Sequence, residues 1–205
     1  SILHDHPKKL CPAPSRSIAG AAMLSNDAPA TARPVPRPHQ PIVLVGMMGV
    51  GKSTIGRRLA TRLHYDFADA DEEIELAANM SVTEIFESYG EPYFRDGERR
   101  VIARLMERDR IVIATGGGAF CDDETRALIL ARGVSIWLDA PIETLVERVG
   151  RRGTRPLLQG RDPAQVLTEL MAKRRGFYAQ ADHHVQSENA PHDRTVGAVL
   201  QAIAA

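Results

Sequence analysis

Gly46, Gly51, Lys52 and Ser53 have the spacing G-x-x-x-x-G-K-S within the stretch GMMGVGKST, residues 46–54. This spacing is typical of a loop that binds nucleotide phosphates through its backbone N–H groups and the positive end of the following helix. The lysine reaches the β- and γ-phosphates, and the serine binds Mg²⁺. The predicted nucleotide-binding residues are Gly49, Val50, Gly51, Lys52, Ser53 and Thr54. The loop indicates phosphoryl chemistry but does not identify the acceptor.

Asp69 and Asp71 close the second apolar run and are the carboxylates best placed for a metal and an acceptor. In an extended chain they point to the same side, so we expect one of them to support Mg²⁺ and the other to meet the acceptor. The alternative is solvated carboxylates or a helix cap ahead of EEIEL. The strand expected at 111–115 lacks the aspartate of generic P-loop hydrolases, and the chain has no N-K-x-D motif, which disfavours a GTPase switch.

Two arginines and a glycine loop are the candidates for binding the acceptor. Arg95 and Glu98 lie three apart on an expected helix, so Glu98 can hold the guanidinium while its outer edge takes a carboxylate. The alternative is an exposed helix pair of little energetic value. Arg174 is the second basic candidate. Three glycines follow the third expected strand: Gly116, Gly117 and Gly118. They allow close approach of a ligand to the backbone. The alternative is that they form only a tight turn into the next helix.

Short apolar runs alternate with helical periodicity after residue 41. The expected strands are residues 42–45, 66–69, 111–115, 134–139 and 183–186. Three of them are almost continuously apolar, as is typical of parallel strands covered by helices on both faces. We therefore predict an α/β fold with a central parallel five-stranded sheet flanked by helices. Residues 69–108 are expected to form a helical acceptor-binding insertion, and the basic stretch 150–162 a mobile lid.

Composition separates the chain of 205 residues into a leader, residues 1–40, and one domain, residues 41–205. The leader holds seven of the thirteen prolines and no aromatic residue, so we expect it to be disordered, either as a transit-like segment or as a simple extension. It carries a net charge of +3 and the domain −3, which indicates no nucleic-acid or membrane partner. Two cysteines are typical of a cytoplasmic protein. We expect a monomer.

Six segments in order along residues 41–205 resemble the shikimate kinase family. They are GMMGVGKST, FADADEEIE, FRDGE at 94–98, ATGGG at 114–118, RPLL at 155–158 and RRGFY at 174–178. The resemblance implies a P-loop kinase fold that uses ATP and Mg²⁺. It implies that Arg95 and Arg174 bind the shikimate carboxylate, that Gly116, Gly117 and Gly118 line the shikimate pocket, and that Asp71 takes the ring hydroxyls.

The same resemblance assigns catalytic and nucleotide-side roles. The implied catalytic residues are Lys52, Asp71 and Arg155, with Asp71 as candidate general base and Arg155 as an arginine finger supplied by the lid. Arg148 and Arg194 match positions near the adenine. The predicted activity is phosphorylation of the 3-hydroxyl of shikimate by ATP. Two alternatives are a sugar-acid kinase of the gluconokinase type and a shikimate-kinase-like protein that binds without catalysis.

Overall fold

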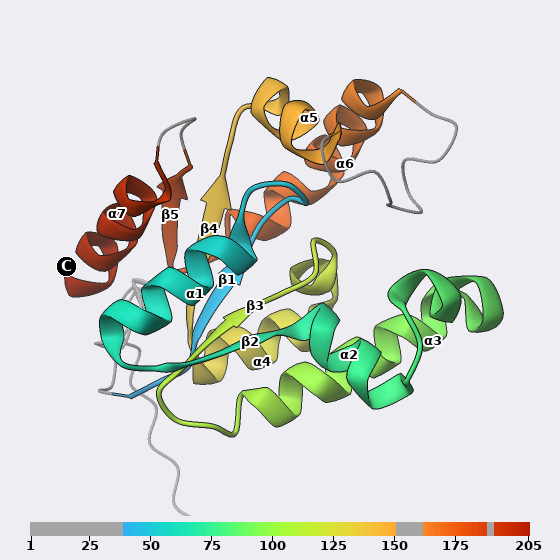
Figure 1. Ribbon diagram of the computed structural model, residues 1–205, viewed down its shortest axis with the longest axis horizontal. Helices are drawn as coiled ribbons and strands as arrows, with labels where there is room; N and C mark the ends of the chain where they lie inside the picture. The colour runs from blue at the N-terminus through green and yellow to red at the C-terminus, as the bar shows by residue number, and fades with distance from the viewer. Residues whose placement is uncertain (1–38, 151–161, 188–190) are drawn as a thin grey trace, which may run out of the picture. The chain divides into compact units, whose positions relative to one another are not determined.

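The computed structural model describes residues 39–150, 162–187 and 191–205 (Figure 1). The chain divides into two units, Ser1–Pro34 and Val35–Ala205, and every described residue belongs to the second. Almost all of the predicted leader lies outside the described residues. The same holds for the predicted lid and for Arg155 within it.

Five parallel strands form one sheet in the order β2-β3-β1-β4-β5. They are β1 (Ile42–Val45), β2 (Asp66–Asp69), β3 (Ile111–Ala114), β4 (Val134–Asp139) and β5 (His183–Gln186). In the register of the central strand β1, Ile42 lies beside Val112 of β3 and Val134 of β4. All residues of these three strands are buried. The predicted parallel sheet, covered on both faces, is therefore confirmed.

The strand bounds agree with the predicted ones except at β3, which ends one residue early. Thr115 still donates to the carbonyl oxygen of Leu44, from its N–H over 3.2 Å and from Oγ1 over 3.0 Å. The chain then turns into the three glycines. These hydrogen bonds tie the start of the glycine loop to β1, the strand that leads into the P-loop.

Seven α-helices and one short 3₁₀ helix occur in the described part of the chain. They are α1 (Lys52–Leu63), α2 (Ala70–Ala78), α3 (Val82–Leu105), η1 (Ala119–Cys121), α4 (Asp123–Arg132), α5 (Ile142–Gly150), α6 (Pro163–Tyr178) and α7 (His192–Ala204). Helices α1 and α7 pack together on one face of the sheet, and α4 lies on the other (Figure 1). Within these described residues, no helix combines the length and the apolar character needed to cross a bilayer.

Helices α2 and α3 form the predicted helical segment between β2 and β3. Helix α3 begins at a capping box, in which Ser81 Oγ accepts from the N–H of Glu84 over 3.2 Å and Glu84 Oε2 accepts from the N–H of Ser81 over 2.7 Å. Gly90, with φ of 80°, interrupts α3, and Pro92 begins its second half. This second half carries Arg95 and Glu98 toward the loop that follows β3.

Candidate active site

The P-loop connects β1 to α1 and requires glycine at its first position. Gly46 has φ of 134°, and a Cβ there would lie 2.3 Å from the carbonyl oxygen of Leu138 in β4. Gly51, with φ of 99°, is the N-cap of α1, and no described side chain caps this helix end. The first N–H groups of α1 therefore face the loop. This is the arrangement that binds anionic phosphates.

Lys52 is the first residue of α1 and lies over the P-loop. Its side chain is mostly buried, with 9% of the residue exposed. Its Nζ donates to the carbonyl oxygens of Gly46 over 2.8 Å and Met47 over 2.9 Å. The loop backbone thus holds the ammonium group at the position from which the sequence pattern predicts contact with phosphate.

Ser53 and Asp69 meet at the start of α2. Ser53 Oγ donates to Asp69 Oδ2 over 2.5 Å, while Asp69 Oδ1 accepts from the N–H of Asp71 over 3.1 Å and caps α2. The expectation that Asp69 and Asp71 extend from one strand to the same side is wrong, because the chain becomes helical at Ala70 and Asp71 lies in the first turn of α2. Asp69 therefore caps α2 through one oxygen and contacts the P-loop serine through the other.

The three glycines after β3 lie against the charged side chains that the sequence singled out. A Cβ on Gly116 would lie 2.9 Å from Asp71 Oδ1 and 2.5 Å from Glu98 Oε1. On Gly117 it would lie 3.2 Å from Arg174 Nη1, and on Gly118 2.5 Å from Arg95 Nη2. The fold therefore brings Asp71, Arg95 and Arg174 together around residues 116–118, from three separate helices.

Arg95 is anchored by carboxylates on its own helix. Its Nη1 donates to Glu98 Oε2 over 2.6 Å and its Nη2 to Glu91 Oε1 over 3.1 Å. The side chains of Arg95 and Glu98 are 23% and 2% exposed, so this is not the exposed pair that the sequence left open. Glu91 is a partner that the sequence reasoning missed, although its i, i+4 spacing to Arg95 would have indicated it.

Burial and ion pairing have opposite effects on the pKa of Glu98 and on that of Arg95. Desolvation raises the pKa of Glu98, and the charge and hydrogen bond of Arg95 oppose that rise only in part. For Arg95, burial lowers the pKa, but Glu98 and Glu91 together outweigh it and the pKa is raised. The guanidinium is therefore charged at any working pH. Its charge and its hydrogen bond both lower the pKa of Glu98.

Arg174 adds a second guanidinium to the same cluster. It lies on α6, and its Nη1 is buried with no hydrogen-bond partner among the described residues. A buried donor without a partner costs free energy, so it fits an acceptor group that arrives with a ligand. Together with Arg95 beside Gly118, it offers two guanidinium groups to an anion such as a carboxylate.

The remaining predicted residues lie in or near the P-loop, in α7 or outside the described residues. Arg148, near the end of α5, donates from Nη1 to the carbonyl oxygen of Val50 over 3.2 Å. Arg194 lies in the first turn of α7. Gly49 and Thr54 lie in the P-loop and the first turn of α1. Ser187, which the sequence did not indicate, also contacts the P-loop through the carbonyl of Val50, over 3.3 Å.

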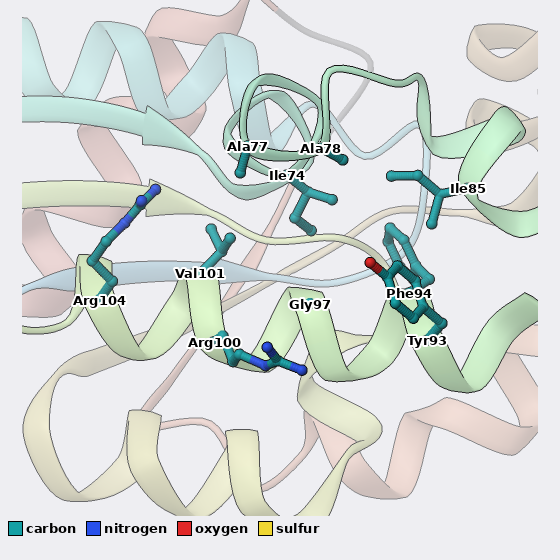
Figure 2. A pocket seen from close by; sticks show the side chains of 10 residues that line it. All are labelled: Ile74, Ala77, Ala78, Ile85, Tyr93, Phe94, Gly97, Arg100, Val101 and Arg104. Carbon is teal, nitrogen blue, oxygen red and sulfur yellow. The ribbon is translucent and has the colours of Figure 1, made fainter. Parts of the chain in front are cut away.

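A cavity of about 380 Å³ lies between α2 and α3, apart from these residues (Figure 2). Its apolar lining includes Ile74, Ile85, Phe94 and Val101. Arg100 and Arg104 also line it, but Arg100 is paired with Asp96. Arg104 is paired with Glu73 over 2.8 Å. None of the predicted site residues lines this cavity.

Comparisons with known proteins identify the family of this chain. A family model described as shikimate kinase matches residues 48–204. The shikimate kinases of Novosphingobium aromaticivorans and Caulobacter vibrioides are 61% and 56% identical over 80% and 79% of this chain, and over 87% and 81% of their own lengths. The solved structure of shikimate kinase from Acinetobacter baumannii in complex with shikimate has a TM-score of 0.79 and 36% identity over 81% of this chain and 93% of that one. The P-loop kinase fold is therefore confirmed, and the chain belongs to the shikimate kinase family.

Proposed function

We propose that this chain transfers the γ-phosphoryl group of ATP to the 3-hydroxyl of shikimate, giving shikimate 3-phosphate and ADP. The observation that carries the proposal is the cluster at residues 116–118, where two guanidinium groups and a carboxylate lie beside the P-loop. Shikimate has one carboxylate and three hydroxyls, so its chemistry matches this set of charges. A relative of known structure was solved in complex with shikimate, which supports the same acceptor.

In this proposal the acceptor is held by Arg95, Arg174 and Asp71. The two guanidinium groups bind the shikimate carboxylate, and Gly116, Gly117 and Gly118 let the ring approach the backbone. Asp71 accepts hydrogen bonds from the ring hydroxyls. It takes the proton of the 3-hydroxyl while the hydroxyl oxygen bonds to the γ-phosphorus and the bond between the γ-phosphorus and the β-phosphate oxygen breaks. Asp71 also lowers the reaction barrier by orienting the hydroxyl before the proton moves.

The residues near the P-loop fit a Mg²⁺ ion. Mg²⁺ prefers oxygen ligands and takes one or two carboxylates along with substrate phosphates. Ser53 Oγ and Asp69 Oδ2, 2.5 Å apart, are such oxygens next to the loop. When bound, the ion would neutralise charge on the phosphates. We propose Ser53 and Asp69 as the residues that hold it.

The nucleotide is held by residues 49–54 in this proposal, with Lys52 on the β- and γ-phosphates. Arg148 and Arg194 lie on the adenine side. Arg155, outside the described residues, serves as an arginine finger on the transferring phosphoryl group, carried by the lid at 150–162. An arginine supplied in cis stabilises charge that develops in the transition state.

An ADP-release assay with shikimate, with gluconate and without an acceptor tests the function. We expect turnover that depends on shikimate. Faster release with gluconate would favour a sugar-acid kinase instead. Shikimate binding without ADP release would indicate a non-catalytic relative.

Gly118→Ala is expected to raise the KM for shikimate about tenfold, since misplacing a charged hydrogen-bonding group costs on the order of one such bond. The new Cβ would lie 2.5 Å from Arg95 Nη2, and the flexible guanidinium must move away. The KM for ATP should stay unchanged, because the P-loop is not touched. Steady-state kinetics with each substrate varied measures both.

Gly97→Ala is the matched control, because a Cβ on Gly97 meets nothing within 4 Å although it lies on the same helix as Arg95. It should leave both KM values unchanged. Equal effects of the two substitutions would contradict the displacement of Arg95.

Asp69→Asn is expected to raise the Mg²⁺ concentration for half-maximal activity about tenfold, in line with the loss of one charged oxygen near the ion. Asparagine is also a good N-cap, so α2 should persist. Asp66→Asn is the control, because Asp66 lies on the same strand and is exposed. An equal Mg²⁺ concentration for half-maximal activity in the two variants would contradict the assignment of Asp69 to the metal site.

We also propose that the protein acts in the cytoplasm as a monomer on small molecules, without nucleic-acid or membrane partners. The balanced charge, with 26 basic and 26 acidic residues, supports the expected lack of nucleic-acid and membrane partners. Light scattering of the purified protein measures its molar mass and so tests whether it is a monomer.

A further inference from the structure

The hydroxyl of Tyr178 lies where three parts of the site meet. Tyr178 is the last residue of α6 and is fully buried, with 0% exposed. Its hydroxyl donates a hydrogen bond to the carbonyl oxygen of Gly117. The Sδ of Met47, in the P-loop, lies 3.8 Å from the same hydroxyl. One side chain of α6 therefore touches both the loop after β1 and the loop after β3.

The two loops also contact each other beside this hydroxyl. A Cβ on Gly117 would lie 3.4 Å from the backbone nitrogen of Met48 and 3.7 Å from the carbonyl oxygen of Gly46. Lys52 Nζ donates to the carbonyl oxygens of Gly46 and Met47, 2.8 and 2.9 Å away. A shift of the glycine loop would therefore press on the backbone that positions Lys52.

Arg174 belongs to the same group of contacts. It lies one helical turn before Tyr178 on α6, a spacing at which side chains meet. Its Nη1 would lie 3.2 Å from a Cβ on Gly117. Burial raises the pKa of Tyr178, and the nearby charge of Arg174 lowers it only in part. The hydroxyl therefore stays protonated and remains a hydrogen-bond donor over the working pH range.

We propose that Tyr178 is a positioning residue that sets the distance between the glycine loop and the P-loop and directs Arg174 toward the acceptor. This inference rests on the proposed function, because it takes the glycine loop to carry shikimate and the P-loop to carry ATP. Tyr178 is buried and acts through Gly117, Met47 and Arg174. A link of this kind couples the two substrates, so that binding of a nucleotide strengthens binding of shikimate.

Tyr178→Phe removes the hydroxyl and keeps the ring. We expect kcat/KM for shikimate to fall about tenfold, because the half-buried Gly117 carbonyl loses its donor. The affinity for ADP measured without shikimate should change by less than about twofold, since no phosphate contact is removed. Calorimetric titration of shikimate with and without ADP should show coupling in the wild type and its loss in the variant. Absence of coupling in the wild type, or equal coupling in both proteins, would overturn the proposal.

Ser135→Ala is the matched control. Ser135 is also 0% exposed, and its hydroxyl donates to Asp182 Oδ2 over 2.6 Å near the start of β4, away from both loops. It should lower Tm with no change in kcat/KM. A loss of activity in Ser135→Ala as large as in Tyr178→Phe would reduce the role of Tyr178 to general stability and overturn the proposal. Failure of the proposed function is a separate result, because the wild type would then show no turnover with shikimate.

Discussion

Lys52→Met lowers kcat for phosphoryl transfer by about 10²–10³-fold or more, the loss seen when one preorganised charge-stabilising group is removed from a site. Methionine has similar length, so the change removes the charge rather than the packing. Lys52 is 9% exposed and is held by the carbonyl oxygens of Gly46 and Met47. An ammonium group in such a poorly hydrated place acts strongly on developing phosphate charge. Steady-state kcat at saturating shikimate and ATP measures the loss.

Lys173→Met is the control for this experiment, because Lys173 is exposed on α6. It should keep wild-type kcat. The thermal stability of Lys52→Met without ligand shows whether the P-loop still folds. A folded Lys52→Met protein with more than about a tenth of wild-type kcat would contradict the assignment, since tenfold corresponds to only about 1.4 kcal/mol.

Arg95→Met raises the KM for shikimate by about 10²-fold, because truncating one partner of a buried charged contact costs about 2–5 kcal/mol. The KM for ATP should hardly change, since Arg95 lies at Gly118 and not at the P-loop. Kinetics with each substrate varied separates the two. Equal rises of both KM values would contradict binding of the shikimate carboxylate by Arg95.

Arg99→Met is the matched control, four residues further along α3. Arg99 is 34% exposed and pairs with Asp96 and Glu124, each over 3.0 Å. The variant loses a guanidinium of similar burial from the same helix. Its KM for shikimate should remain close to that of the wild type.

Arg95→Met should also unfold more easily, because it leaves Glu98 buried without its cation, a loss of about 3–5 kcal/mol. The pKa of Glu98 is already raised by burial and rises further without Arg95. A carboxyl with a raised folded pKa favours the fold below its unfolded pKa, and this contribution is lost as pH rises through the folded value. The destabilisation should therefore grow with pH. Arg95→Met/Glu98→Gln should recover Tm but not shikimate affinity, which separates binding from stability.

The strands and the P-loop were predictable because their signals are local. Runs of four to six residues, three of them almost continuously apolar, place all five strands within one residue of their observed bounds. The Ser81–Glu84 capping box that begins α3 is likewise a local pattern, with serine and glutamate three residues apart in the sequence. Even so, local reasoning was wrong for Asp69 and Asp71, because it assumed an extended chain where α2 begins. Dihedral angles at a strand–helix boundary depend on a capping hydrogen bond, which spacing does not reveal.

By itself, the sequence determined that phosphate is bound, which helices and strands form, and which charged residues are candidates for the acceptor. Only the tertiary structure decided that Asp71, Arg95 and Arg174 gather around three glycines, that Glu98 is buried, and that Tyr178 joins two loops. The physical reason is that periodicity and caps act over a few residues. Distances between α2, α3 and α6 depend on strand order and on packing against the sheet, which no short segment specifies.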